Sequence, residues 1–174
     1  VRIYNRALTS EEIWQHYINS KQVSAHFGPQ TTCDEDPASC MEYGLVGYWS
    51  FDEGQGSTAY DISGNNNNGT LVNGPKWTKG KKGGALEFDG VDDYVECGSN
   101  TSLDLTELTI EAWIYPTGSG GINDGIVSHR TRPSTNQGNY AFVLLTTGYL
   151  RFVYFSNSVW NTLDSTLSVD NGRW

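Results

Sequence analysis

Oxygen-bearing side chains gather in one glycine-rich stretch, WSFDEGQGSTAYDISGNNNNGTL. Calcium binds about six to eight oxygens, drawn from carboxylates, amide side chains and backbone carbonyls, and this stretch offers all three kinds. Its glycines permit the turns that point carbonyls inward. We therefore predict a calcium site in which Asp61 is the first ligand, with further ligands from Asp52, Glu53, Asn65, Asn67 and Gly69.

A second interpretation of the same stretch needs no metal. Asp and Asn side chains readily hydrogen-bond their own backbone two residues further on, in Asx turns. Asp61 and the run from Asn65 to Asn68 would then only shape the loop. The sequence leaves both interpretations open.

The cysteines and histidines do not show metal-ligand spacing, because the three histidines are scattered along the chain. Cys33 and Cys40 bracket the polar segment DEDPAS and would close a small disulfide loop, which requires an oxidising compartment. Cys97 is left over beside an apolar segment. We expect it to be a buried thiol or to pair outside this chain.

The segments that would position these residues are short and mostly alternate apolar with polar side chains. Eight of them follow Gly44, separated by clusters of Gly, Asn, Asp, Ser and Pro: LVGYWSF, GTLVNG, ALEFD, YVECG, LTIEAWIYP, GIVSH, YAFVLLT and YLRFVYF. This spacing predicts an all-β fold, an antiparallel β-sandwich or jelly roll, with one short helix near the N-terminus. Trp49 and Trp113 lie within the strand patterns, so we expect both in the core.

The first 43 residues show a different pattern of apolar and polar residues. VRIY alternates at the strand period, and Thr9 with Glu12 three residues later forms a capping box, which marks the start of a helix. One apolar stripe of that helix is formed by Ile13, Trp14, Tyr17 and Ile18. Residues 21–43 show no periodicity and read as a linker.

Charge and hydropathy exclude two classes of partner. The formal net charge is −9, whereas nucleic-acid binding demands clustered Lys and Arg. The one basic cluster, Lys76 to Lys82, is short and interrupted by glycine, which is typical of a solvated hairpin tip. No apolar run approaches the ~20 residues that span a bilayer, so we expect neither nucleic-acid binding nor a membrane span.

Several blocks in fixed order resemble the laminin G-like, concanavalin A-like jelly-roll superfamily of secreted bacterial and archaeal proteins. They are GLVGYWSFDEGQGSTAYDISGNNNNGTLVNGPKW, GGALEFDGVDDYVECG and LTIEAWIYP, and the resemblance covers residues 44–174. The opening VRIYNRALTSEEI resembles the final strand and trailing helix of such a module. The resemblance implies a secreted or cell-surface protein whose residues 1–20 end one module, 21–43 form a linker, and 44–174 form a module truncated at its last strands.

In this fold the first and last strands are neighbours. Val1–Leu8 would therefore fold back into the last-strand position of its own chain, or exchange with another copy, because an unpaired edge templates strand addition. Relatives often hold calcium near this junction, which agrees with the calcium site predicted above.

Some relatives of this superfold are glycoside hydrolases, and hydrolysis needs two carboxylates at a defined separation. The pattern Glu87-Phe88-Asp89 puts two carboxylates on one strand face, but Gly90 and Val91 stand where those hydrolases are expected to have a third acidic residue. We interpret Glu87 and Asp89 as strand-end polar residues and expect no catalysis.

Carbohydrate binding is the common role that the resemblance implies, and sugars stack on exposed aromatic rings. Trp160, in the polar run SNSVWNT, and Tyr140 are the rings expected at a ligand surface, although either ring would equally cover the sandwich edge. Polar partners for hydroxyl or carboxyl groups are expected in the loop after GIVSH: His129, Arg130, Arg132 and Asn139. The expected function is a non-catalytic carbohydrate-binding or adhesion module that contacts glycans or other cell-surface proteins.

A structural role is the alternative. Tandem jelly rolls also serve as spacers or assembly modules of surface layers, adhesins and extracellular filaments, where the partners are adjacent modules of the same polypeptide. Two sequons, at Asn68 and Asn100, lie in predicted loops and matter only if the source glycosylates its secreted proteins.

Overall fold

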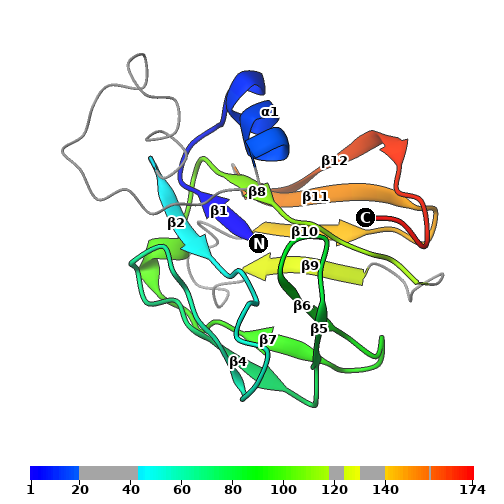
Figure 1. The fold of residues 1–174 in the computed structure, drawn as a ribbon. Coiled ribbons are helices and arrows are strands. Elements are labelled where there is room, and N and C mark those ends of the chain that lie inside the picture. The colour runs from blue at the N-terminus through cyan, green and yellow to red at the C-terminus, as the bar shows by residue number, and fades with distance from the viewer. Residues whose placement is uncertain (20–42, 118–123, 130–139, 157) are drawn as a thin grey trace.

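The computed structural model of the chain describes residues 1–19, 43–117, 124–129, 140–156 and 158–174. These residues form an antiparallel β-sandwich with one α-helix near the N-terminus (Figure 1), which confirms the predicted fold class. All eight predicted strand segments contain a strand.

The elements follow one another along the chain as β1 (Arg2–Tyr4), α1 (Ser10–Asn19), β2 (Leu45–Tyr48), β3 (Thr58–Ala59), β4 (Gly69–Val72), β5 (Lys76–Lys79), β6 (Gly84–Glu87), β7 (Tyr94–Glu96), the 3-10 turn η2 (Thr101–Leu103), β8 (Thr109–Glu111), β9 (Asp124–His129), β10 (Tyr140–Leu144), β11 (Tyr149–Ser156) and β12 (Val159–Ser168). Among the described residues they pair into sheets of order β2-β1-β8, β12-β11-β10-β9, β3-β4-β7 and β5-β6. β12 is a strand that the sequence pattern did not predict.

The N-terminal strand β1 lies in the middle of its sheet. Ile3 is opposite Gly47 of β2 on one side and Ile110 of β8 on the other, and both pairings are antiparallel. The backbone amide of Trp49 extends the pairing by donating to the carbonyl of Val1. Of the two alternatives for Val1–Leu8, the structure has the one in which the segment pairs within its own chain.

Helix α1 begins with the predicted capping box. The Thr9 hydroxyl accepts from the amide of Glu12 at 3.2 Å, and the Glu12 carboxylate accepts from the amide of Thr9 at 2.7 Å. Arg6 donates to both carboxylate oxygens of Glu12 at 2.6 and 3.1 Å. These bonds satisfy amide donors that a helix start otherwise leaves unpaired.

The core lies around the junction of β1, β2 and the η2 turn. Its buried members are Ile3, Val46, Trp49, Ala59 and Leu103. Trp49 is 4% exposed, as predicted, whereas the core placement predicted for Trp113 is wrong because this side chain is 40% exposed. Trp113 follows β8 on the strand face opposite to Ile110, and Ile110 is the residue that packs against the core.

Two sequence predictions about the first half of the chain remain predictions. The predicted linker lies almost wholly outside the described residues, together with Cys33 and Cys40, so the division into 1–20, 21–43 and 44–174 is not tested.

Cys97 is a half-buried free thiol, and burial raises its pKa to about 12. At neutral pH this thiol is therefore protonated and unreactive.

Candidate functional site

The four-stranded sheet β12-β11-β10-β9 carries a pocket of about 270 Å³ on one face. Side chains directly opposite each other on paired strands share a face, and alternation along each strand repeats that face every second residue. The lining follows this rule, because Ala141 is opposite both Ser128 and Val153, and Val153 is opposite Thr162. The full lining is Gly125, Ser128, Ala141, Val143, Arg151, Val153 and Thr162.

At β9 and β10 the other face of this sheet is turned to the interior. Tyr140 is 2% exposed and His129 is 8% exposed, and Val127 packs against the core. The pocket face is therefore the outer face of the sheet, and we call it the β9–β12 outer face.

Two pairs of larger side chains flank the pocket on β11 and β12. Arg151 and Asp164 form an exposed ion pair with nitrogen–oxygen distances of 2.6 and 2.7 Å. The hydrogen bonds from Arg151 lower the pKa of Asp164, so this carboxylate is ionised at neutral pH. Phe155 and Trp160 meet edge to face at a centroid distance of 5.2 Å, and Trp160 is 50% exposed.

The structure places Trp160 at this surface but corrects the expected position of Tyr140 and His129. These two residues pair across β10 and β9 with ring centroids 5.3 Å apart, and both point inward. His129 Nε2 lies 2.8 Å from a carboxylate oxygen of Asp104. The polar neighbours of Tyr140 in the sequence suggested exposure, but the strand register turns its ring toward the interior.

The remaining predicted ligand residues, Arg130, Arg132 and Asn139, lie outside the described part of the chain. Sequence reasoning missed the pocket lining itself, because its residues are mostly small and carry no chemical signal along the chain. The pairing of Arg151 with Asp164 was also missed, since 13 residues separate them.

The loop predicted to bind calcium is organised around Asp61, which is 8% exposed. One carboxylate oxygen of Asp61 accepts from the amides of Tyr48 and Ser63, both at 2.9 Å. The other oxygen accepts from the Ser63 hydroxyl and the amide of Asn67, again at 2.9 Å. Asp61 thus joins β2 to the asparagine run through four hydrogen bonds.

The other predicted ligands also have contacts within the fold. Asn67 is 2% exposed, donates to the carbonyl of Val46 and exchanges hydrogen bonds with the Ser102 hydroxyl. Asn65 also donates to Val46, and Asp52 accepts from the amide of Gly84 at 2.7 Å. Gly69 begins β4 with no room for a side chain, since a Cβ there would collide with Val95.

These contacts match the Asx-turn interpretation for Asp61, because its oxygens already accept from protein donors. Glu53 differs: one oxygen accepts from the amide of Tyr60, and Oε2 is buried without a hydrogen-bond partner among the described residues. Calcium binding in this loop stays a prediction, and an ion bound by Asp61 would have to displace donors that the folded chain supplies.

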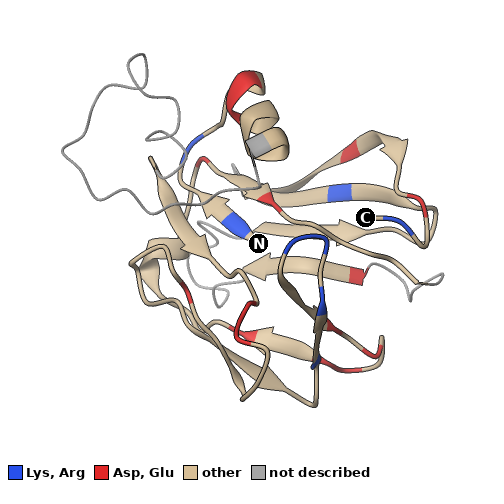
Figure 2. Cartoon of the chain, in the orientation of Figure 1, with Lys and Arg blue, Asp and Glu red and all other residues tan. Residues whose placement is uncertain are grey.

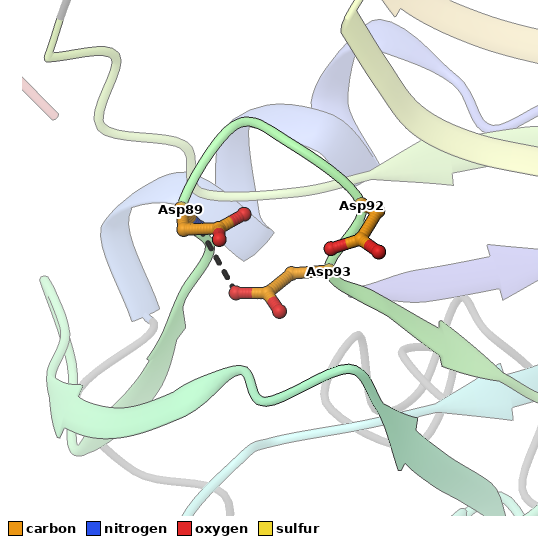
Figure 3. Close-up of side chains that lie close together, drawn as sticks. All are labelled: Asp89, Asp92 and Asp93. Atoms are coloured by element: carbon orange, nitrogen blue, oxygen red, sulfur yellow. Dashed lines mark hydrogen bonds between the residues drawn. The ribbon is translucent and has the colours of Figure 1, made fainter.

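A different group of carboxylates comes together in the turn between β6 and β7. One oxygen from each of Asp89, Asp92 and Asp93 lies within 4.8 Å of the others (Figure 3). The amide of Asp89 donates to Asp93, the amide of Val91 donates to Asp89, and the Asn73 side chain donates to Asp92. These bonds shape the turn, while Oδ1 of Asp93 is buried without a hydrogen-bond partner among the described residues.

The proposed strand-end character of Glu87 and Asp89 agrees with this geometry. β6 ends at Glu87, and Asp89 lies in the turn that follows. The two sequon asparagines are exposed, but each side chain accepts a backbone hydrogen bond, Asn68 from Asp61 and Asn100 from Ser102. No helix in the described part of the chain is long and apolar enough to cross a membrane.

Comparisons with known proteins agree with this architecture. The chain is similar to the 2.1 Å crystal structure of a fragment of an S-layer domain-containing protein from Clostridium thermocellum ATCC 27405, with a TM-score of 0.57 and 24% sequence identity. That match covers 74% of this chain and 60% of the other. A comparison with curated protein sequences found no match. Residues 89–174, which contain β7 to β12 and the pocket, match the family model of the concanavalin A-like lectin/glucanases superfamily.

Proposed function

We propose that the protein is a non-catalytic glycan-binding module of an extracellular multidomain protein. The observation that carries the proposal is the β9–β12 outer face, where a pocket of about 270 Å³ lies beside an exposed aromatic ring and an exposed ion pair. The family-model match over residues 89–174 and the likeness to a fragment of an S-layer domain-containing protein support an extracellular setting.

The chemistry of this face suits a sugar. The apolar face of a pyranose stacks on an exposed ring, and Trp160 offers such a ring next to the pocket. Hydroxyl groups need nearby donors and acceptors, which Ser128 and Thr162 supply in the pocket. The Arg151–Asp164 pair offers a planar donor and an ionised acceptor at the same face.

The same face supports binding rather than hydrolysis. A glycosidase of the common two-carboxylate type needs an acid and a base or nucleophile that flank the bond. None of the described residues that line the pocket is Asp or Glu, and the nearby Asp164 is held by Arg151 at 2.6 Å. Glu87 and Asp89 belong to the β6 strand end and the turn after it.

The test is a panel of neutral and charged glycans applied to the full chain and to Trp160→Ala. We expect binding to at least one glycan, weakened about tenfold or more in the variant, since truncating a Trp that anchors an interface to alanine typically costs about 2 kcal/mol or more. Leu163→Ala is the matched control, because Leu163 is on β12 but on the opposite face from Trp160. Silence across the panel, or equal binding by Trp160→Ala, would refute the proposal.

An assembly role is the second candidate, and the edge of β12 favours it. This strand is ten residues long, pairs only with β11 among the described strands, and exposes Val159, Leu163 and Leu167 by 58–79%. Long apolar edge strands are templates for pairing with other chains. Concentration-dependent association in sedimentation experiments, abolished by Leu163→Lys, would favour assembly, whereas a monomer at all concentrations would exclude this edge as an interface.

A further inference from the structure

Helix α1 is docked with its polar side inward. His16 is 6% exposed, lies 2.9 Å from the carboxylate of Glu111 on β8, and stacks on Tyr4 with ring centroids 5.6 Å apart. Trp14 and Tyr17 on the same helix are 54% and 57% exposed. The apolar stripe predicted from the sequence therefore faces outward, and a histidine makes the contact that a hydrophobic residue makes in an ordinary amphipathic helix.

The exposed rings of α1 continue onto the segment after β8. Trp14 stacks on Tyr17 at a centroid distance of 5.6 Å, and Tyr17 lies 5.8 Å from Trp113. Trp113 is 40% exposed. We call these three residues the aromatic row.

Positive charge borders the aromatic row on one side. The ammonium groups of Lys81 and Lys82, at the turn between β5 and β6, lie 5.9 and 5.5 Å from the ring centroid of Trp113. Figure 2 shows this turn as a blue arch in a chain whose net charge is −9. Four of the five lysines are in this hairpin, at Lys76, Lys79, Lys81 and Lys82.

We infer that the aromatic row and the lysine hairpin together form a binding site for an acidic polysaccharide, a polymer of uronic acid type. Its pyranose rings present apolar C–H faces to Trp14 and Trp113, and its carboxylates meet the ammonium of Lys81. The site is separate from the β9–β12 outer face and does not depend on the glycan binding proposed there.

Charge complementarity selects this occupant. A chain of net charge −9 repels polyanions over most of its surface. A polyanion is therefore expected to bind at the basic patch beside the exposed rings. A neutral glycan would gain nothing from the lysines. A second copy of the chain also carries −9, and general repulsion disfavours it as the partner.

The experiment measures binding of polygalacturonate to the full chain, with its methyl-esterified form as the uncharged counterpart. We expect binding of the acidic polymer alone, weakened by added salt because exposed charges are screened. Lys81→Gln should weaken binding roughly threefold, the size expected for one exposed charge pair, and Trp14→Ala should weaken it further. Lys76→Gln is the matched control, because it removes the same charge at the far end of β5.

Four outcomes would overturn the inference. Equal binding of both polymers would remove the role of charge, and equal losses in Lys81→Gln and Lys76→Gln would remove the role of this site. Loss of polygalacturonate binding in Trp160→Ala would assign the polymer to the β9–β12 outer face instead. Self-association that disappears in Lys81→Gln would make this surface an interface between copies.

Discussion

The sheet around β1 and the sheet that ends in β12 use strands in opposite ways. β1 has three residues, two neighbouring strands, and side chains of Ile3 and Tyr4 that are 2% and 0% exposed. β12 has ten residues, one neighbour among the described strands, and Leu167 that is 79% exposed. Position in the sheet, and not strand length, decides how deeply the side chains of these two strands are buried.

Polar groups show the same contrast. Asp61, beside β2, is buried and accepts four hydrogen bonds, so its chemistry is used to hold the fold. Asp164, on β12, is exposed and has Arg151 as its partner at the surface. A carboxylate signals a binding surface only when the fold leaves it accessible, and the sequence gives no direct measure of that.

The largest expected effect is at Ile3. Ile3→Ala should lower the free energy of unfolding by roughly 2–5 kcal/mol, because it removes a buried side chain and leaves a cavity next to Trp49 and Val46. Leu167→Ala on β12 should change the same quantity by less than about 0.5 kcal/mol. Urea denaturation of both variants measures the difference, and losses of equal size would break the contrast.

A smaller effect is expected at Asp61. Asp61→Ala should lower the free energy of unfolding by roughly 2 kcal/mol, because buried donors on Tyr48 and Asn67 lose their acceptor. Asp170→Ala, which removes a carboxylate from an exposed ion pair with Arg173, is the control and should be nearly neutral.

Asp61→Ala and the parent chain together also test calcium binding. If Asp61 serves the fold alone, chelation leaves the Tm of the parent chain unchanged, and the loss in Asp61→Ala is the same with and without calcium. A Tm that falls on chelation in the parent but not in Asp61→Ala would establish calcium at this residue.

The smallest effect is expected at the start of α1. Thr9→Ala should cost about 1 kcal/mol of stability because the amide of Glu12 loses its cap. Thermal denaturation followed by circular dichroism measures this loss, and Thr9→Ser should restore most of it. A Thr9→Ala variant as stable as the parent would show that tertiary contacts alone hold the helix.

Glu12 adds a pH dependence at the same helix start. Hydrogen bonds from Arg6 and then from Thr9 lower its pKa from 4.5 to about 2. Because the folded pKa is lowered, the stabilisation is complete above pH 4.5 and is lost as the pH falls toward 2. Glu12→Gln should flatten this part of the stability–pH curve, whereas Glu11→Gln, whose carboxylate bonds Gln15, should leave it; equal curves would contradict the assignment.

The sequence predicted what depends on local pattern. The alternating segments contain strands, Thr9 and Glu12 form the predicted capping box, and Trp49 is buried in the core. β12 was missed because most of its residues are Asn, Thr, Asp and Ser, which are typical of loops as well as of edge strands.

What the sequence could not predict depends on distant partners. Tyr140 has polar neighbours in the chain, but it is buried because its register opposite His129 and Tyr154 places its ring on the inward face of the sheet. Trp113 is exposed because Ile110, three residues earlier, fixes which face of the strand meets the core. The pocket of the β9–β12 outer face exists only after four strands have found their register.

Glycan binding at the β9–β12 outer face is tested most directly by an NMR map of backbone amides in the full chain as a glycan identified by the panel is added. We expect shifts centred on the β9–β12 outer face, at Ala141, Val153, Trp160 and Thr162, with the amides of Ile3 and Asp61 unchanged. Shifts centred on β1, β2 and the Asp61 loop, with none on β10 to β12, would contradict it.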